Sequence, residues 1–406
     1  MDISSYDAER DFDAVVRIWR EVGWIDSDSE AKAMEYFLDG TDCYVSLIDG
    51  SAECAVMTTP GLIRYQDVDL PLSIVSGVTT SLVGRKRGLA SGLTAHAVGE
   101  AGKSGAAVSI LGMFEQGFYD QFGFGSGSYE HHLRFDPASL SVDVPYRPPV
   151  RITIDDWEAV AVAFGARHRR HGGITADPPG FIRAEMIRAD KPFGLGYRSE
   201  TGELTHFIWG RTKGESGPYR VDMLSYQTTD QLLELFKLVS VLGDQVRSIS
   251  ITEPSGIQLQ DLVQHVVRQE IATAKSDHAF RHVSGTWWQL RIMDLPACVA
   301  ARSYQGPPVR FVAEITDPLD AMLNGAWTGV GGSYVVTIGE ESSAKPGSDD
   351  SLPVLTASVN AFSRVWLGVR AASSLTVTDD LSGPADLIAD LDRALALPAP
   401  RPDMFF

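Results

Sequence analysis

Apolar positions in the first part of the chain recur first with the spacing of a helix and then with that of strands. Within residues 7–23 one helical face collects Phe12, Val15, Val16, Ile18 and Trp19. Gly23 is a suitable stop for this helix. Strand-like runs follow at "CYVSLID", "ECAVMTTPGLIRY" and "LPLSIVSGVTTS". A helix rich in Gly and Ala over about 88–101 and the buried-type strand "AAVSILGM" complete an alternation that predicts an α/β domain.

Two more regions follow this first domain. The Pro-rich passage "VDVPYRPPVR" predicts a boundary, and "YRVDMLSYQTTDQLLELFKLVSVLGDQVRSISITEP" then repeats a strand, a long amphipathic helix and a strand. A third region begins near Leu295 and ends with a helix in "GPADLIADLDRALAL". We therefore expect an α/β (α+β) chain with domains at 1–145, 146–294 and 295–406, as its 406 residues allow more than one core.

Composition narrows the classes of partner. Fifty-three acidic and 35 basic residues give a formal net charge of -18, which disfavours a nucleic-acid partner and favours cationic small molecules. Three scattered cysteines predict neither a metal site nor a disulfide framework, and they suit a reducing cytoplasm. No apolar run approaches the roughly 20 residues of a membrane span, so we expect no membrane partner.

One short segment concentrates positive charge against this acidic background. Arg85, Lys86, Arg87, Gly88, Leu89 and Ala90 follow a strand and open the Gly/Ala-rich helix. Unpaired N–H groups at a helix start bind phosphate, and the three cations add charge-assisted bonds. A basic loop with a coincidental glycine is the alternative. The segment resembles the acyl-CoA pyrophosphate signature of GNAT N-acetyltransferases, R/Q-x-x-G-x-G/A, and we expect Val78 and Thr80 to offer a free strand edge to the pantetheine amides.

A second motif supplies a proton donor. In "EQGFYDQFGFGSGSYEHHLRFD" the residues Phe118, Phe122 and Phe124 fit a core, and within this cluster at 118–124 only Tyr119 carries a hydroxyl. Placed after the buried strand "SILGM", this tyrosine would stand beside the coenzyme sulfur and protonate the departing thiolate.

Four segments together resemble the Eis family of GNAT acetyltransferases. They are the phosphate loop, the G-F-Y-x-x-F-G-F-G segment, the strand-helix-strand passage at 220–252 and "WWQLRIMDLPACVAARSY". The resemblance implies tandem GNAT-like domains, the second without a phosphate loop, and a C-terminal domain similar to sterol carrier protein. It implies acetyl transfer from acetyl-CoA to aminoglycosides or lysine side chains. The chain departs from the family pattern at Phe114 and at the penultimate Phe405.

The same resemblance assigns roles and an assembly. Tyr119 would be the general acid, and the terminal carboxylate of Phe406 would enter the active site as the base. The resemblance also implies a homohexamer. A frayed C-terminal tail is the alternative for the last residues.

The acceptor site is less sharply marked. Trp24 and Asp26, in "GWIDSDSEAKAMEYF", would bind a polyamine or a similar amine through charge and cation–π contact. The alternative is a solvated loop in which Ser27 or Asp28 caps a helix.

His131 and His132 point to opposite faces of a strand and predict no metal site. The segment "RHRRHGG" predicts a basic helix end without a ligand. An acyl-CoA or lipid carrier without catalysis, and a transferase for longer acyl groups, remain alternative functions.

Overall fold

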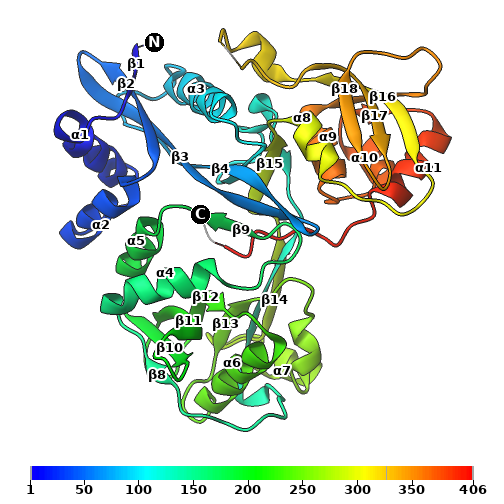
Figure 1. The fold of residues 1–406 in the computed structure, drawn as a ribbon. Coiled ribbons are helices and arrows are strands. Elements are labelled where there is room, and N and C mark those ends of the chain that lie inside the picture. Colours follow the sequence, from blue (N-terminus) through cyan, green and yellow to red (C-terminus); the bar gives the residue numbers. More distant parts are fainter. Residues whose placement is uncertain (1, 326, 405–406) are drawn as a thin grey trace.

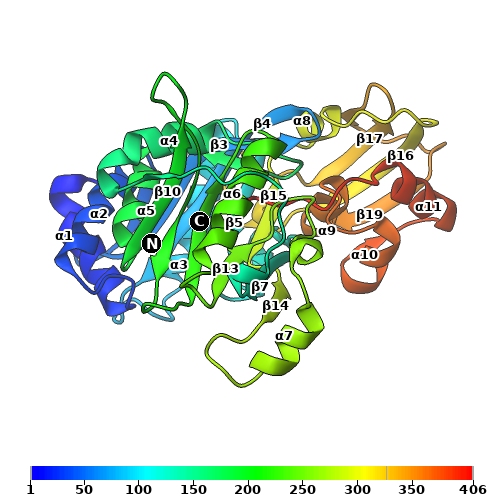
Figure 2. The same cartoon turned by 90° about the horizontal axis from the view of Figure 1, so that it is seen from below.

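The protein folds around three mixed β-sheets, which the computed structural model describes for residues 2–325 and 327–404. Figure 1 shows the first domain at the upper left, the second below it, and the third at the right. Viewed from below in Figure 2, the helices of the first domain and the third domain lie at opposite ends. None of the helices in these residues is both long and apolar enough to span a bilayer.

The first sheet has eight strands. Its order is β1 (Asp2–Ser5), β2 (Asp42–Ile48), β3 (Ser51–Tyr65), β4 (Val68–Thr80), β5 (Val108–Gly112), β15 (Trp288–Ile292) and β6 (Gly125–Ser126), with β9 (Ile174–Ala176) added to β3. Helices α1 (Ala8–Glu21), α2 (Asp28–Leu38) and α3 (Leu89–Lys103) accompany it, and η1 (Asp120–Phe122) is a short 3₁₀ helix. Asp7 caps α1 by accepting from the Arg10 N–H, which explains why the predicted helix starts there.

The second sheet has seven strands. Its order is β14 (Arg281–Gly285), β7 (Glu130–Phe135), β13 (Ile249–Thr252), β12 (Tyr219–Ser225), β11 (Leu204–Thr212), β10 (Pro192–Arg198) and β8 (Val150–Arg151). The helices here are α4 (Trp157–Gly165), α5 (Gly180–Arg188), α6 (Thr229–Leu242) and α7 (Val266–Thr273), with 3₁₀ turns η2 (Pro137–Ser139), η3 (Ile154–Asp156) and η4 (Leu259–Leu262). The predicted strand-helix-strand passage is β12, α6 and β13, whose strands pair in parallel.

The third sheet has five strands. Their order is β18 (Ser343–Pro346), β17 (Gly332–Ile338), β16 (Val309–Thr316), β19 (Val354–Ser358) and β20 (Leu381–Ser382). It is accompanied by α8 (Leu295–Ala300), η5 (Pro318–Ala321), α9 (Val359–Trp366), α10 (Ala372–Thr378) and α11 (Ala385–Ala394). The expected terminal helix is α11.

The limits of the sheets differ from the domain limits expected at 145/146 and 294/295. β7 precedes the first limit but belongs to the second sheet, and β15 precedes the second limit but belongs to the first sheet. β6 and β7 pair with β15 and β14 in one unbroken antiparallel register, from Leu290 opposite Gly125 to Arg281 opposite Arg134. This two-stranded ribbon therefore runs from one sheet into the other (Figure 1).

The third domain shares a core with the first sheet. Tyr65 of β3 stacks on Trp366 of α9 with ring centroids 4.5 Å apart, and its hydroxyl donates to the Trp366 carbonyl at 3.0 Å. An ion pair between Arg291 of β15 and Asp317, at 2.5 Å, is fully buried. Asp317 also accepts from the backbone N–H groups of Leu319 and Val330. These contacts fix the third domain against the first.

Replacing Asp317 by Ala should strongly destabilise the protein, because it leaves the Arg291 guanidinium buried without a countercharge. Removing one partner of a buried ion pair costs about 3–5 kcal/mol. Chemical denaturation followed by tryptophan fluorescence would measure the loss. Asp390→Ala is the matched control, since its pair with Arg393 is exposed and worth about 0–1 kcal/mol. Equal losses in the two variants would contradict the assigned role of the buried pair.

Candidate active site

The predicted phosphate loop connects β4 to α3. The Ser81 N–H donates to the Glu53 carbonyl at 2.9 Å, and the Gly84 N–H donates to the Ser81 carbonyl at 3.2 Å, so both ends of this turn are tied down. Lys86 and Gly88 have positive φ angles of 58° and 76°. A side chain at Gly88 would meet nothing within 4 Å, so this glycine is required for its backbone angle and leaves open space in front of the helix.

The start of α3 has free donors and positive charge. Gly88, its cap, provides no side-chain hydrogen bond, and the first turn contains no acidic residue. Arg85, Lys86 and Arg87 are exposed, and within residues 2–325 and 327–404 none of them has a hydrogen-bonded or ion-paired partner. Leu89 is buried and Ala90 partly buried, which anchors the first turn. The arrangement suits a bound anion.

The second domain has no equivalent of this feature. Helix α6 lies between the parallel strands β12 and β13 as α3 lies between β4 and β5. At its start, however, the Thr228 side chain accepts from the Gln231 N–H, and Asp230 occupies the first turn. The Thr228 hydroxyl thus occupies a backbone N–H that an anion would need, and the Asp230 carboxylate offsets the positive charge of the helix start. The two helix starts therefore differ chemically in the way that the sequence predicted.

Beside the phosphate loop the pairing of β4 with β5 stops, which leaves a gap in the backbone hydrogen bonding of the sheet. Their parallel pairing ends at Val75 opposite Leu111, and beyond it β4 pairs only with β3 through a bulge. Gly77 lies in this bulge with φ 63°, and a Cβ there would approach Met57 Sδ to 2.9 Å. Val78 and Thr80 lie on the stretch of β4 that has no partner on the β5 side, which leaves strand-edge groups available to a ligand.

Trp19 holds this bulge in place. Its indole N–H donates to Thr79 Oγ1 at 3.0 Å. Trp24 packs edge-on against Trp19, with ring centroids 5.5 Å apart, and is 38 % exposed. Asp26 is also exposed, and its carboxylate has no bonded partner in the described chain. The capping alternative holds for its neighbour Ser27, which forms a capping box with Glu30 at the start of α2.

Tyr119 lies in the apolar cluster that also contains Val75, Val78 and Leu111 from the two sides of the gap. Its ring contacts Phe118 at 4.9 Å and Phe114 at 5.8 Å between centroids. Burial raises the pKa of this phenol above its ordinary value, so the hydroxyl keeps its proton at neutral pH. No hydrogen bond to the hydroxyl occurs among the described residues. The phenol is therefore available as a donor.

The C-terminal segment runs from the third domain back to the centre of the molecule (Figure 1), and residues 400–402 in it are buried. Arg401 donates to the Glu253 carbonyl at 2.7 Å, and the Pro402 carbonyl accepts from the Ile174 N–H at 3.0 Å. Arg167 donates to the Asp403 carbonyl at 3.1 Å. The tail is thus ordered up to Met404. The terminal residue, Phe406, lies outside the described residues, as does Phe405.

The segment "RHRRHGG" therefore has a role that the sequence did not suggest. Helix α4 ends at Gly165, and the Arg167 guanidinium donates to the Phe164 carbonyl in its last turn at 2.9 Å. Arg167 and Gly172 also contact the tail. A Cβ on Gly172 would lie 2.5 Å from Pro400 Cβ, so only glycine permits this close approach. His171 is buried, with Nε2 3.0 Å from the Leu367 carbonyl and Nδ1 accepting from the Gln66 N–H at 3.1 Å. Arg167 thus fits the predicted basic helix end, and the contact of the segment with the tail is an addition to that prediction.

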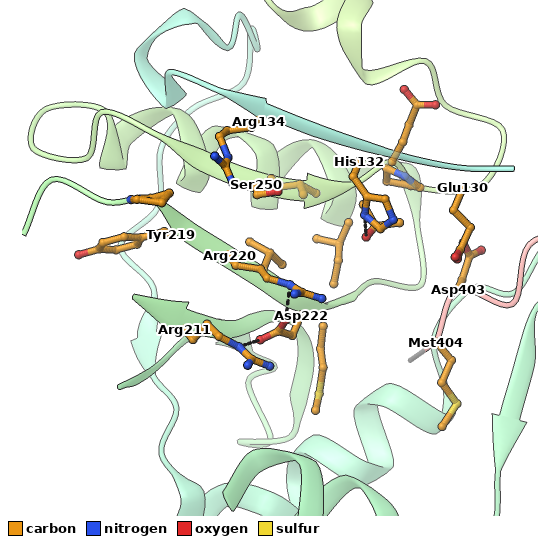
Figure 3. A pocket seen from close by; sticks show the side chains of 18 of the residues that line it. Glu130, His132, Arg134, Arg211, Tyr219, Arg220, Asp222, Ser250, Asp403 and Met404 are labelled. Atoms are coloured by element: carbon orange, nitrogen blue, oxygen red, sulfur yellow. Dashed lines mark hydrogen bonds and ion pairs between the residues drawn. The ribbon is translucent and has the colours of Figure 1, made fainter. Parts of the chain in front are cut away.

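A cavity of about 1040 Å³ lies where the tail, the two sheets and α4 meet (Figure 3). Gly112 at the end of β5 and Trp288 contribute from the first sheet. Strand β7 contributes Glu130, His132 and Arg134, which alternate along one face of the strand. Asp403 and Met404 contribute from the tail. The cavity therefore begins where β5 ends and continues over the second sheet.

Two carboxyl groups at the tail end of this cavity have raised pKa values. Burial, followed by the nearby charge of Asp403, raises the pKa of Glu130 to about 7. Burial raises the pKa of Asp403 to about 6, although the guanidinium of Arg167 opposes the rise. Both groups titrate near neutral pH, where a carboxyl can take up and release a proton.

The two adjacent histidines face different neighbours. His131 Nδ1 lies 3.0 Å from His282 Nε2, whereas His132 Nδ1 lies 3.0 Å from Thr252 Oγ1. They therefore do not share one site, in agreement with their positions on the strand. Burial and then the charge of Arg220 lower the pKa of His132, which lines the cavity. Across residues 2–325 and 327–404 no group of His, Cys, Asp and Glu has a metal-binding arrangement.

The sequence alone did not point to the cavity residues of β7, the tail residue Asp403 or the arginines that hold the tail. A signal was present for β7, because Glu130, His132 and Arg134 occupy alternate positions and so share a face. The side of the molecule on which that face lies depends on the partners of β7, which the local pattern does not encode.

Comparisons with known proteins agree with this geometry. Residues 5–127 match the family model described as an acetyltransferase (GNAT) domain. An uncharacterized N-acetyltransferase from Streptomyces avermitilis is 25 % identical over 362 residues, which cover 83 % of this chain and 81 % of the relative.

Solved structures match the whole length of the chain. Eis1 from Mycobacterium abscessus superposes with a TM-score of 0.77 at 17 % identity and covers 100 % of both chains. A probable N-acyltransferase from Enterococcus faecalis V583 gives 0.78 at 19 % identity, covering 98 % of this chain and 97 % of that one. A GCN5-related N-acetyltransferase from Kribbella flavida gives 0.75 at 20 % identity, with 100 % and 98 % covered.

The family model indicates the acetyltransferase activity, and the full-length superpositions show the fold. The chain is thus an N-acetyltransferase with a GNAT domain at residues 5–127, and over its whole length it has the fold of Eis1.

Proposed function

We propose that the enzyme transfers the acetyl group of acetyl-CoA directly to the amine of a small molecule or of a lysine side chain. One observation carries the proposal. The gap between β4 and β5 opens beside an uncapped, cationic helix start, so one ligand can span both features. The GNAT family implies acetyl-CoA as the donor.

The residues at this site fit such a donor. The N–H groups of Gly88, Leu89 and Ala90 and the charges of Arg85, Lys86 and Arg87 would hold its phosphates, because they are unengaged and the space before Gly88 is open. The strand edge at Val78 and Thr80 would hold its amide arm. When bound, acetyl-CoA supplies an activated acetyl thioester.

Proton transfers are assigned to two groups. Tyr119 keeps its proton and lies in the cluster that borders the gap, so it would protonate the thiolate leaving group. An amine with a pKa of about 10 must lose a proton before it attacks, and the carboxylate of Phe406 would accept that proton. The course of the tail supports this role, because Asp403 and Met404 line the cavity and Phe406 follows Met404 by two positions in the sequence.

The acceptor classes proposed are aminoglycosides, polyamines and lysine-like amines. A chain with a net charge of -18 attracts positively charged solutes. Trp24 and Asp26 would contact the acceptor near the gap, since Trp24 packs on the residue that holds the bulge. We further propose that the enzyme works in the cytoplasm, where its three buried, unpaired cysteines stay reduced.

Gly88→Asp should abolish the increase in melting temperature that acetyl-CoA produces. The new carboxylate would repel the pyrophosphate, and the residue would be strained at φ 76°. Gly105→Asp is the matched control, because it introduces the same residue at φ 93° beyond the other end of α3. Thermal shift assays with and without acetyl-CoA test this. An undiminished shift in Gly88→Asp would remove the loop from the donor site.

Tyr119→Phe should lower kcat by about 10²- to 10⁴-fold, the usual contribution of a general acid, while the affinity for acetyl-CoA stays the same. Steady-state kinetics and calorimetric titration with acetyl-CoA separate these effects. Tyr129→Phe serves as the control, since Tyr129 is 51 % exposed and outside the gap. Wild-type turnover in Tyr119→Phe would assign the acid to another group.

Adding residues after Phe406, or deleting it, should strongly reduce turnover, because either change displaces the proposed base. The same tag at the N-terminus should not, since β1 forms the edge of the first sheet. Acetyl-CoA should stabilise all of these variants equally. Full activity of the C-terminally extended enzyme would place the base elsewhere.

We propose a homohexamer as the assembly of this enzyme. Light scattering should then give a mass near six times the 44.1 kDa of one chain. A mass near that of a single chain would refute the assembly and leave the proposed chemistry untouched.

A further inference from the structure

Four arginines form a single row across the second sheet. The strand pairing places Arg281 opposite Arg134, Arg134 opposite Ser250, Ser250 opposite Arg220, and Arg220 opposite Arg211. Residues directly opposite one another project from the same face of a sheet. All five residues line the cavity that also contains Asp403, and Figure 3 shows Arg134, Arg220 and Arg211 together at one end of it.

The row has too few countercharges. Asp222 binds Arg211 and Arg220, both at 2.8 Å, and so compensates two guanidiniums with one carboxylate. In the part of the chain that the structure describes, Arg134 and Arg281 have no ion pair and no hydrogen bond through their side chains. Like charges directly opposite destabilise a sheet, so this arrangement costs stability unless an anion binds to it.

The surroundings add to the imbalance. Lys191 and Lys213 line the same end of the cavity, and Asp190 is the second carboxylate there. Six cations thus face two carboxylates in a chain whose net charge is -18. An exposed row of arginines is usually a solvated surface, but Arg134 is partly buried on β7, between β14 and β13. The excess of positive charge is therefore local and built into the cavity.

The opposite end of the cavity is acidic. Glu130 and Asp403 lie there, near the end of β5 and the tail. Glu130 and Arg134 share one face of β7, four residues apart, which corresponds to about 13 Å along an extended strand. One cavity therefore presents carboxyl groups toward the gap and guanidinium groups away from it.

We propose that the arginine row binds an anionic group of the acceptor, so that the acceptor is an amine that also carries a carboxylate or a phosphate at some distance. The inference rests on the proposed amine acetyltransferase function and narrows its acceptor class. The ammonium of such a molecule would lie toward Glu130, Asp403 and the tail, and its anion toward Arg134 and Arg281. Guanidinium groups bind either anion in a two-pronged manner. Among the proposed acceptors, a lysine-like molecule with a free carboxylate fits and a polyamine does not.

The test compares acceptors that differ only in the anion. Acetyl transfer to ω-aminoalkanoates of four to eight carbons is measured against n-alkylamines of the same length, with ω-aminoalkyl phosphates as a second arm. A charged hydrogen-bonded contact of about 1.5–3 kcal/mol corresponds to a preference of roughly 10- to 100-fold in kcat/KM for the anionic acceptors. Whichever series has the higher kcat/KM, the carboxylates or the phosphates, identifies the anion that the arginine row binds.

The double variant Arg134→Gln/Arg281→Gln should remove most of this preference. Its melting temperature without ligand should equal or exceed that of the wild type, because the substitutions relieve repulsion. Arg268→Gln is the matched control, since Arg268 on α7 is exposed and lies outside the cavity. Equal kcat/KM for both acceptor types in the wild type, or a preference that survives in the double variant, would overturn the inference.

Calorimetric titration of 6-aminohexanoate into the CoA-loaded protein separates this inference from the proposed function. If no amine is acetylated but 6-aminohexanoate binds the wild type and not the double variant, amine transfer fails and the anion site stands. If alkylamines and polyamines are acetylated without any benefit from an anion, the proposed function stands and the arginine-row site is overturned.

Discussion

The antiparallel ribbon that crosses from the first sheet to the second is the constraint on which the site depends. β6 and β7 pair with β15 and β14 without a break in register, so the positions of the two sheets are fixed by backbone hydrogen bonds. Trp288 of this ribbon also lies opposite Gly112 at the end of β5. The gap beside β4, the cavity and the point at which the ribbon passes from one sheet to the other therefore lie together. Gly127 lies against the Trp288 ring, where a Cβ would approach to 2.1 Å, which shows how closely the ribbon packs.

The buried arginines join the third domain to this crossing. Arg291 on β15 pairs with Asp317, and Arg167 and Arg401 hold the C-terminal segment against the second domain. Guanidinium groups suit this role because each donates several hydrogen bonds in a fixed plane to backbone carbonyls and carboxylates. As a result, a segment that begins in the third domain ends beside the other two. The site is composed of residues from all three parts of the chain.

The two strand-helix-strand units illustrate how one topology supports different chemistry. Helices α3 and α6 both connect parallel strands, but Gly88 leaves the start of α3 open and Thr228 closes the start of α6. A single cap residue and the charge of the neighbouring residues decide which helix start can hold an anion. In the second domain the positive charge lies instead on strands, in a row across the sheet that faces the cavity.

The sequence by itself determined the features that depend on a few neighbouring residues. The helix start at Gly88, the first helix after Asp7 and the apolar setting of Tyr119 follow from local backbone preference, charge and apolar spacing, and the structure has these elements where the sequence predicts them. Only the tertiary structure decided which sheet β7 and β15 join, where "RHRRHGG" binds, and which face of β7 lines the cavity. These depend on pairings between residues more than 100 positions apart, such as Glu130 with Gly285 and Arg167 with Asp403. Alternation along a strand defines its two faces, but the partner strands determine what each face meets.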